Sequence, residues 1–400
     1  QAYCDGLNLY ASRHPEKLKR NIWPAKPQDL VAGSIHKLPI MFGIQGHIAR
    51  LIEEKENKSS ANALNPKALP IGSNFIAVGP SRSADQATRV CINSHQPWTG
   101  PVTWYEAHLI SEEGQNLYGG LFPGSPVIFL GHNENIAWGH TVNQPDLVDV
   151  FKLELNPANP NQYKVDGEWL DLERSLAPLE IRLWGNFRWT VNREVLYSIY
   201  GPAMRVDDQV FAIRYAGIGE FRQIEQWYRM GRALNLDEFK DAMRIHSLAM
   251  FNTGYGDRDG NIFYSYNALL PERADGHDWS GTVPGNTRDT LWTEYRPFDE
   301  LPIVENPKSG FIQNCNSDPF QTTTGEDNPD ETAFSENYGI EKWMTNRARR
   351  AVELYGGDDS INHDEFFKYK YDKTYSEKSG LRRQVANLLD AQPENNGLKK

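Results

Sequence analysis

The stretch Leu69-Pro70-Ile71-Gly72-Ser73-Asn74-Phe75-Ile76-Ala77-Val78 decides how the rest of this sequence is interpreted. A turn-forming proline and glycine lead into a serine, and the serine begins a short apolar run typical of a strand. Upstream, the charged run Glu53–Lys58 gives way to small polar residues up to Ala63, a composition typical of an exposed linker open to proteolysis. We therefore predict that the Gly72–Ser73 bond is a self-cleavage site and that Ser73 becomes a new chain N-terminus.

A serine at a chain N-terminus can supply both a nucleophile and its base. The hydroxyl attacks, and the free α-amino group, whose unperturbed pKa is about 8, accepts the hydroxyl proton. Three features favour this role for Ser73 over that of an ordinary surface serine. Gly72 has no side chain to shield the carbonyl group, and the upstream linker gives the chain length to adjust at the bond. The start of a strand places the hydroxyl at a sheet end.

The composition limits the class of protein. The 400 residues suffice for one large domain or two ordinary ones, and 39% hydrophobic with 12% aromatic residues favours a packed, sheet-rich core. The net charge of −11 argues against a nucleic-acid partner, and no apolar run approaches the length of a membrane span. Three widely spaced cysteines indicate neither a zinc site nor a disulfide framework, so we expect buried thiols.

The coarse pattern along the chain is helical, then strand-rich, then helical again. We expect a short helix that ends before Pro15 and a second helix that starts at Pro27. A helical segment at 224–243, capped by Asn235 or Asp237, interrupts the strands, and residues 337–393 are helical. The predicted strands cover residues 75–78, 89–93, 127–131, 136–142, 148–155, 163–169, 177–183, 187–199, 210–215, 251–255 and 261–266.

Several further segments, in order along essentially the whole chain, resemble the penicillin acylase family of N-terminal-nucleophile hydrolases. The most specific block combines Pro123-Gly124-Ser125-Pro126 with Gly131-His132-Asn133 and Ala137-Trp138-Gly139. The other matching segments are Tyr3–Asn8, Gly72–Asn74, Asn93–Trp98 and Asn252–Tyr264. His95 lies 22 residues after Ser73, as in the acyl-homoserine-lactone acylase and aculeacin acylase branch.

The resemblance implies an α+β fold, a four-layer αββα sandwich in which two antiparallel sheets lie between helical layers. It implies that residues 1–58 are the tail of a small α-subunit, that 59–72 form a spacer ending at the cleavage site, and that 73–400 are the truncated N-terminal part of the β-subunit. After processing, the protein would be an α/β heterodimer. Family members are exported, which implies a periplasmic or secreted protein, although residues 1–6 do not form a signal peptide.

The family's catalytic roles carry over to matching residues. Ser73 would be the nucleophile, and His95 would support its amine and hydroxyl. The Val142 backbone N–H and the Asn252 side-chain amide would donate to the oxyanion, while Arg273 would orient Asn252. Taken alone, His95 could be an ordinary strand histidine and Asn252 could cap a turn, so their joint spacing from Ser73 is the argument for these roles.

The segment Asp146-Leu147-Val148-Asp149 resembles the family's calcium loop. Two carboxylates and a backbone carbonyl suit a hard cation, so Asp146, Val148 and Asp149 are the predicted ligands. Either Glu53 or Glu54 would supply the family's α-subunit ligand. The alternative is a surface loop with solvated aspartates. No transition metal and no organic cofactor are expected.

These residues predict an amidohydrolase that cleaves a linear N-acyl amide through an acyl-enzyme. His95 favours acyl-homoserine lactones or related aliphatic acyl amides, and penicillin or cephalosporin acylase specificity is the alternative. A hypothesis of another class is an unprocessed, non-catalytic binding protein of the same fold, in which the amine of Ser73 stays within a peptide bond.

Overall fold

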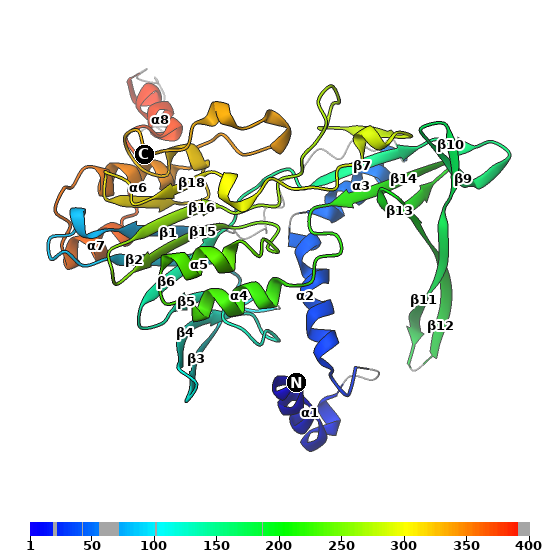
Figure 1. Cartoon of the computed structure of the whole chain (residues 1–400), viewed down its shortest axis with the longest axis horizontal. Helices are drawn as coiled ribbons and strands as arrows, with labels where there is room; N and C mark the ends of the chain where they lie inside the picture. The colour runs from blue at the N-terminus through cyan, green and yellow to red at the C-terminus, as the bar shows by residue number, and fades with distance from the viewer. Residues whose placement is uncertain (19–21, 42, 56–71, 101, 186, 391–400) are drawn as a thin grey trace.

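The strand that begins at the predicted cleavage site, β1 (Gly72–Val78), is the middle strand of a three-stranded antiparallel sheet. Its neighbours are β19 (Phe311–Asn314) and β2 (Arg89–His95). The computed structural model describes residues 1–18, 22–41, 43–55, 72–100, 102–185 and 187–390 (Figure 1). The predicted spacer at 59–72 therefore lies outside the described residues, apart from Gly72.

Both faces of β1 are buried, which explains its uninterrupted apolar run. Phe75 and Ala77 belong to a hydrophobic cluster shared with a neighbouring seven-stranded sheet, whereas Ile76 and Val78 belong to a cluster shared with helices on the other side. Because successive side chains in a strand point to opposite faces, Ser73 lies on the same face as Phe75, and Asn74 lies on the same face as Ile76.

The seven-stranded sheet is antiparallel and packs closely against β1. An added Cβ at Gly254 would lie 2.1 Å from the Phe75 ring, so glycine at this position lets the two sheets approach each other. The strand order is β18-β16-β15-β6-β5-β4-β3, with β18 at Ile303–Glu305, β16 at Ile262–Tyr266, β15 at Asn252–Asp257, β6 at Ile136–Thr141, β5 at Leu130–His132, β4 at Gln115–Leu121 and β3 at Tyr105–Ser111.

Helices cover the outer faces of these two sheets. On one side, α4 (Gln223–Arg232) contacts β4 and β5 and packs with α5 (Leu236–Met243). On the other side, α6 (Asn346–Gly356) contacts β19 and packs with α7 (His363–Lys370). The layers therefore run helix, sheet, sheet, helix, which confirms the predicted α+β, four-layer αββα architecture.

A further sheet lies beyond the four layers, so the prediction of two sheets was incomplete. Figure 1 shows its long hairpin, β11–β12, projecting from the body. The order is β11-β12-β13-β14-β7-β17, with β11 at Glu173–Trp184, β12 at Phe187–Ser198, β13 at Gly201–Val206, β14 at Gln209–Tyr215, β7 at Val148–Leu153 and β17 at Thr282–Gly285. A small sheet of β10 (Glu168–Asp171), β9 (Asn159–Val165) and β8 (Leu155–Asn156) adjoins it along the chain.

The N-terminal helices match their predicted limits. The first, α1 (Ala2–Arg13), ends before Pro15, and α2 (Pro27–Met41) begins at Pro27. Helix α2 contacts α4, which brings the N-terminal segment beside the main body, and α3 (Ile44–Lys55) contacts β7 and β13. Among the described residues, no helix has the length and hydropathy that crossing a membrane requires.

Two predicted helical segments are wrong in detail. Residues 224–243 form two helices rather than one, because the chain turns between α4 and α5 and Asn235 caps the second by accepting from the backbone N–H of Glu238. Residues 337–393 contain α6, α7 and α8 (Gly380–Asp390) within the described part, separated by loops. In place of the strand predicted at 127–131, the structure has the shorter strand β5, which covers Leu130–His132.

Candidate active site

Ser73 lies one residue into β1 and is buried, with 3% of its surface exposed. The antiparallel register places Gly72 opposite His95 and Ser73 opposite Ser94. The hydroxyl of Ser73 donates to the carbonyl oxygen of Gly72, with an O–O distance of 2.7 Å. The strand therefore holds the predicted nucleophile directly against the carbonyl group of the bond that we expect it to cleave.

Two side chains that the sequence analysis missed hold Ser73 in place. The backbone N–H of Ser73 donates to Asn316 Oδ1 at 2.6 Å, and Arg347 Nη1 donates to the Ser73 carbonyl oxygen at 2.6 Å. Arg347 Nη2 also donates to Asn316 Oδ1 at 2.8 Å, and Nη1 contacts Asn74 Oδ1. Arg347 and Asn316 thus clamp the polar groups on both sides of the Ser73 Cα.

Gly72 is tightly enclosed by the same groups. A Cβ added there would lie 2.9 Å from Arg347 Nη2, 2.9 Å from Asn316 Oδ1 and 3.2 Å from His95 Nδ1. The two contacts of 2.9 Å are shorter than real Cβ atoms make, so a side chain at position 72 would displace the ends of Arg347 and Asn316 from this arrangement. They also place His95 Nδ1 beside Gly72.

His95 stands at the end of β2, beside the Gly72–Ser73 bond. Partial burial lowers the pKa of its imidazole from the ordinary value, and the positive charge of Arg347 lowers that pKa further. The ring is therefore neutral at neutral pH and can accept a proton there. The structure places His95 beside Gly72, next to Ser73, while its chemical role stays a prediction.

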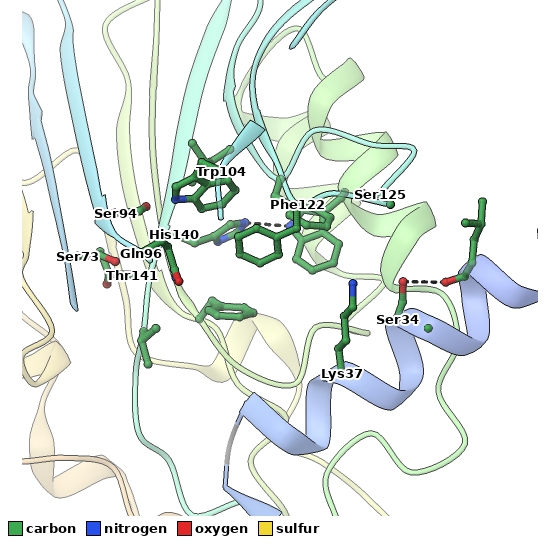
Figure 2. A pocket seen from close by; sticks show the side chains of 18 of the residues that line it. Ser34, Lys37, Ser73, Ser94, Gln96, Trp104, Phe122, Ser125, His140 and Thr141 are labelled. Atoms are coloured by element: carbon green, nitrogen blue, oxygen red, sulfur yellow. Dashed lines mark hydrogen bonds between the residues drawn. The ribbon is translucent and has the colours of Figure 1, made fainter. Parts of the chain in front are cut away.

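A cavity of about 160 Å³ opens beside Ser73. Figure 2 shows Ser73, Ser94, Gln96 and Thr141 gathered on one side of it, with Lys37 and Ser34 of α2 on the other. Aromatic side chains line the space between them, which suits an apolar group. The apolar lining residues are Leu30, Trp104, Phe122, Phe129, Leu130, Val142, Trp227 and Phe251.

His140 forms part of the cavity wall and is fixed in one tautomer by its neighbours. Its Nε2 accepts from the Trp227 indole N–H at 3.1 Å, and its Nδ1 lies 3.1 Å from Thr253 Oγ1. Complete burial lowers the pKa of this imidazole to about 4. A neutral, immobile ring therefore keeps Trp227 in position.

Val142 and Asn252 have different positions relative to Ser73. Val142 lines the cavity, its carbonyl oxygen accepts from Asn316 Nδ2 at 2.8 Å, and its backbone N–H has no hydrogen-bond partner among the described residues. Asn252 is 1% exposed, and its amide N–H groups donate to Thr141 Oγ1 at 3.1 Å and Asn314 Oδ1 at 3.2 Å.

This geometry corrects the prediction for Asn252. Its oxygen also accepts from the Tyr264 hydroxyl at 2.6 Å, so the whole side chain belongs to a buried network beneath the site. Asn316 Nδ2, in contrast, makes one hydrogen bond, to Val142, within the described part of the chain, which leaves its second N–H for a ligand. The geometry therefore favours Asn316 over Asn252 as the side-chain oxyanion donor.

The prediction that Arg273 orients Asn252 is wrong. The Arg273 guanidinium is fully buried and binds Asp149, with Nε donating to Oδ2 at 2.9 Å. It also donates to the Asp146 carbonyl oxygen at 3.0 Å and to the Asn337 carbonyl oxygen. A buried guanidinium requires a carboxylate partner, and Asp149 supplies it.

The same ion pair bears on the predicted calcium ligands Asp146, Val148 and Asp149. Asp149 Oδ2 is occupied by Arg273 and by the Trp292 indole N–H, whereas the buried Oδ1 has no partner among the described residues. Calcium takes six to eight oxygen ligands. No group of three or more candidate metal-binding side chains converges anywhere in the described part of the chain.

Among the described residues, this loop therefore supplies fewer free oxygen ligands than calcium takes. The side chains of Glu53 and Glu54, the predicted additional ligands, lie outside the described residues. Calcium binding stays a prediction.

Of the two residues that the sequence analysis missed, Asn316 lies in a segment with a recognisable sequence signal. The segment Asn314-Cys315-Asn316-Ser317-Asp318 begins with the last residue of the buried strand β19, and such a polar cluster at a strand end is a typical place for functional side chains. Arg347 carried no comparable signal, because it lies among several arginines at the start of α6.

The fold and this site define the class of protein. A thermostable penicillin G acylase from Alcaligenes faecalis has a solved structure that superposes with a TM-score of 0.65 at 24% sequence identity, covering 81% of this chain and 56% of that chain. The fold is therefore that of the N-terminal-nucleophile hydrolases.

The family follows from the sequence comparison. A family model described as penicillin amidase matches residues 1–399, so the chain belongs to the penicillin amidase family. An acyl-homoserine lactone acylase PvdQ of Pseudomonas fluorescens is 27% identical over 68% of this chain and 38% of its own length. A penicillin G acylase of Escherichia coli is 29% identical over 66% of this chain and 30% of its own length. The chain spans less than half the length of these two relatives.

Proposed function

We propose that this protein is an amidohydrolase that cleaves linear N-acyl amides through an acyl-enzyme on Ser73. The observation that carries the proposal is the Ser73 hydroxyl, 2.7 Å from the Gly72 carbonyl oxygen and beside an apolar cavity, with its backbone nitrogen held by Asn316. The names of the relatives, both acylases, support the same class of reaction.

The first step is cleavage of the chain's own Gly72–Ser73 bond. Ser73 Oγ attacks the Gly72 carbonyl carbon, and His95, whose Nδ1 lies beside Gly72, accepts the hydroxyl proton. The C–N bond then breaks, the Ser73 nitrogen takes up a proton and leaves as a free amine, and an ester joins Gly72 to Oγ. Water hydrolyses this ester, which regenerates the hydroxyl and gives Gly72 a carboxylate.

The second reaction uses the free amine. The α-amino group accepts the Oγ proton as Oγ attacks the substrate carbonyl, so one residue supplies both nucleophile and base. The Val142 backbone N–H and the second N–H of Asn316 stabilise the oxyanion. The substrate nitrogen leaves with the proton, and water then releases the acyl group from Ser73.

The cavity beside Ser73 holds the acyl group. Its lining is mainly aromatic and aliphatic, with Asp29 and Lys37 as the charged members, and this composition favours an apolar acyl chain. The substrate is an acyl-homoserine lactone or a related aliphatic amide, and a penicillin-type amide is the alternative. The cleaved chains stay together as an α/β heterodimer, in the periplasm or outside the cell.

The test is hydrolysis of a panel of N-acyl amides that differ in acyl-chain length, together with phenylacetyl and glutaryl amides. We expect release of free amine from apolar acyl amides and none from the Ser73→Ala variant. Turnover by Ser73→Ala at the wild-type rate, or the absence of turnover of every amide by processed protein, would overturn the proposal.

A further inference from the structure

A second cavity, of about 260 Å³, lies on the face of β1 opposite the Ser73 hydroxyl. Asn74 and Ile76, which alternate with Ser73 and Phe75 along the strand, contribute to its wall. Its floor is buried, and its rim, which includes Lys373 and Thr374, is exposed. The other lining residues come from β2, from the turn after β19, and from α6, α7 and the segment that follows α7.

Two cations in this cavity lack a carboxylate partner among the described residues. Within the part of the chain that the structure describes, Arg347 donates only to the uncharged oxygens of Ser73, Asn74 and Asn316, and its burial lowers the pKa of the guanidinium. The Lys370 ammonium lies 5.1 Å from the centroid of the Tyr371 ring and, within the described chain, makes no ion pair. A buried or half-buried positive charge without a counter-ion is destabilising, so this cavity favours an anion.

The other charged groups that line the cavity do not cancel this excess. Asp372 is its single carboxylate among the described lining residues, and it is bound to Arg350 Nε at 2.9 Å. Arg350 also contacts Glu353 at 3.3 Å. This arginine is therefore compensated, whereas Arg347 and Lys370 are not.

A buried hydroxyl without a partner lies at the same cavity. Tyr355 of α6 is 2% exposed, and its hydroxyl makes no hydrogen bond within the described part of the chain. The hydroxyl lies near the thiols of Cys91 and Cys315, which also line the cavity. Buried hydroxyl groups are rarely left without a partner, so this donor requires an acceptor that the described residues do not provide.

We propose that this cavity binds a small oxyanion, a phosphate or a carboxylate, which accepts from the Tyr355 hydroxyl and neutralises Lys370 and Arg347. The site is distinct from the acyl cavity, because β1 separates them. Arg347 belongs to both sites, since it also donates to the Ser73 carbonyl oxygen. Bound anion therefore fixes Arg347 and stabilises the strand that carries the nucleophile.

The test is isothermal titration calorimetry on the full chain carrying Ser73→Ala, titrated with inorganic phosphate and, separately, with acetate at ionic strength matched with chloride. Saturable binding of one or both anions is expected. Tyr355→Phe and Lys370→Met should each raise the dissociation constant of the anion at least tenfold. Lys152→Met, which removes an exposed lysine of β7, is the matched control and should leave it unchanged.

The proposal is overturned if neither anion binds more tightly than chloride, or if Lys152→Met weakens binding as much as Lys370→Met. It is also overturned if the Tyr355 and Lys370 variants bind like the parent. If Tyr355→Phe fails to fold, the anion affinity of the Lys370→Met variant decides whether the proposal holds. Because the Ser73→Ala protein is not expected to turn over amides, the result does not depend on the proposed catalytic function.

Discussion

The backbone nitrogen of Ser73 lies 2.6 Å from the side-chain oxygen of Asn316, which is 243 residues further along the chain. This hydrogen bond ties the group that would become the catalytic amine to the polar turn after β19. The other side of the same asparagine binds the Val142 carbonyl oxygen at 2.8 Å. Asn316 thus fixes the backbone of Ser73 and the backbone of Val142 relative to each other.

Asn316 and Asn252 should respond differently to substitution. Asn316→Ala removes a donor to the oxyanion and should lower kcat by about 100- to 1,000-fold. Asn252→Ala removes the buried hydrogen bonds to Thr141, Asn314 and Tyr264 and leaves these partners unsatisfied. It should therefore lower the free energy of unfolding by about 1–3 kcal/mol. Amide hydrolysis assays and urea unfolding measure the two effects. A larger loss of kcat in a stably folded Asn252→Ala variant would restore the original assignment.

Arg347 should act as a positioning residue whose positive charge lowers the pKa of the free Ser73 amine. Its positive charge beside the Ser73 nitrogen disfavours protonation of the free amine, so Arg347→Met should raise the pKa of that amine. The acidic limb of the pH profile of kcat/KM should then move about one unit higher. Arg347→Lys keeps the charge and should keep the limb in place.

Arg349→Met provides the matched control for Arg347, because it removes a guanidinium from the same helix. Among the described residues, that guanidinium donates only to the Met344 carbonyl oxygen, at 3.4 Å. An acidic limb that is identical in the wild type and in Arg347→Met would contradict the electrostatic role.

Gly72→Ala should block processing for steric reasons. The new Cβ would lie 2.9 Å from Arg347 Nη2 and from Asn316 Oδ1, so the clamp around Ser73 would have to open. Gly6→Ala, at a position on α1 with no atom within 4 Å of the added Cβ, is the control and should process normally. Denaturing gels over a time course give the readout. Normal processing of Gly72→Ala would show that the clamp is not needed for cleavage.

His140 should make stability depend on pH. Its pKa in the folded protein is about 4, below the ordinary value of 6.5, so the unfolded chain takes up the proton first. Stability is therefore fully present above pH 6.5 and decreases as the pH falls toward 4, by up to about 3 kcal/mol. Urea unfolding at several pH values should show a shallower loss for His140→Gln than for the wild type. The exposed His132→Gln serves as control, and equal slopes in all three proteins would exclude this origin.

The nucleophile strand and the four layers could be predicted from the sequence because their signals are local. The run Phe75-Ile76-Ala77-Val78 is apolar on both faces, and β1 is indeed covered by a sheet on one side and by helices on the other. The break between α4 and α5 was missed because their apolar spacing continues across the turn, although the Asn235 cap was identified.

The sequence predicted Ser73, His95 and Val142 at the site but not Asn316 and Arg347, because the last two come from distant parts of the chain. Asn252 was selected from the family resemblance of its segment and its spacing from Ser73, yet tertiary packing uses its amide inside the core. Arg273 was selected from its neighbours, and the need of a buried guanidinium for a carboxylate places it on Asp149 instead. Arg347 reaches Ser73 across 274 residues, a relationship that no local pattern indicates.

The most direct test of the central claim is the N-terminal sequence of the large fragment after expression of the full chain. Intact mass spectrometry should show cleavage between Gly72 and Ser73, and sequencing should read Ser-Asn-Phe-Ile. The Ser73→Ala variant should remain uncut at this bond. A fragment that begins at another residue, a chain that stays intact after long incubation, or equal cleavage of Ser73→Ala would contradict the account.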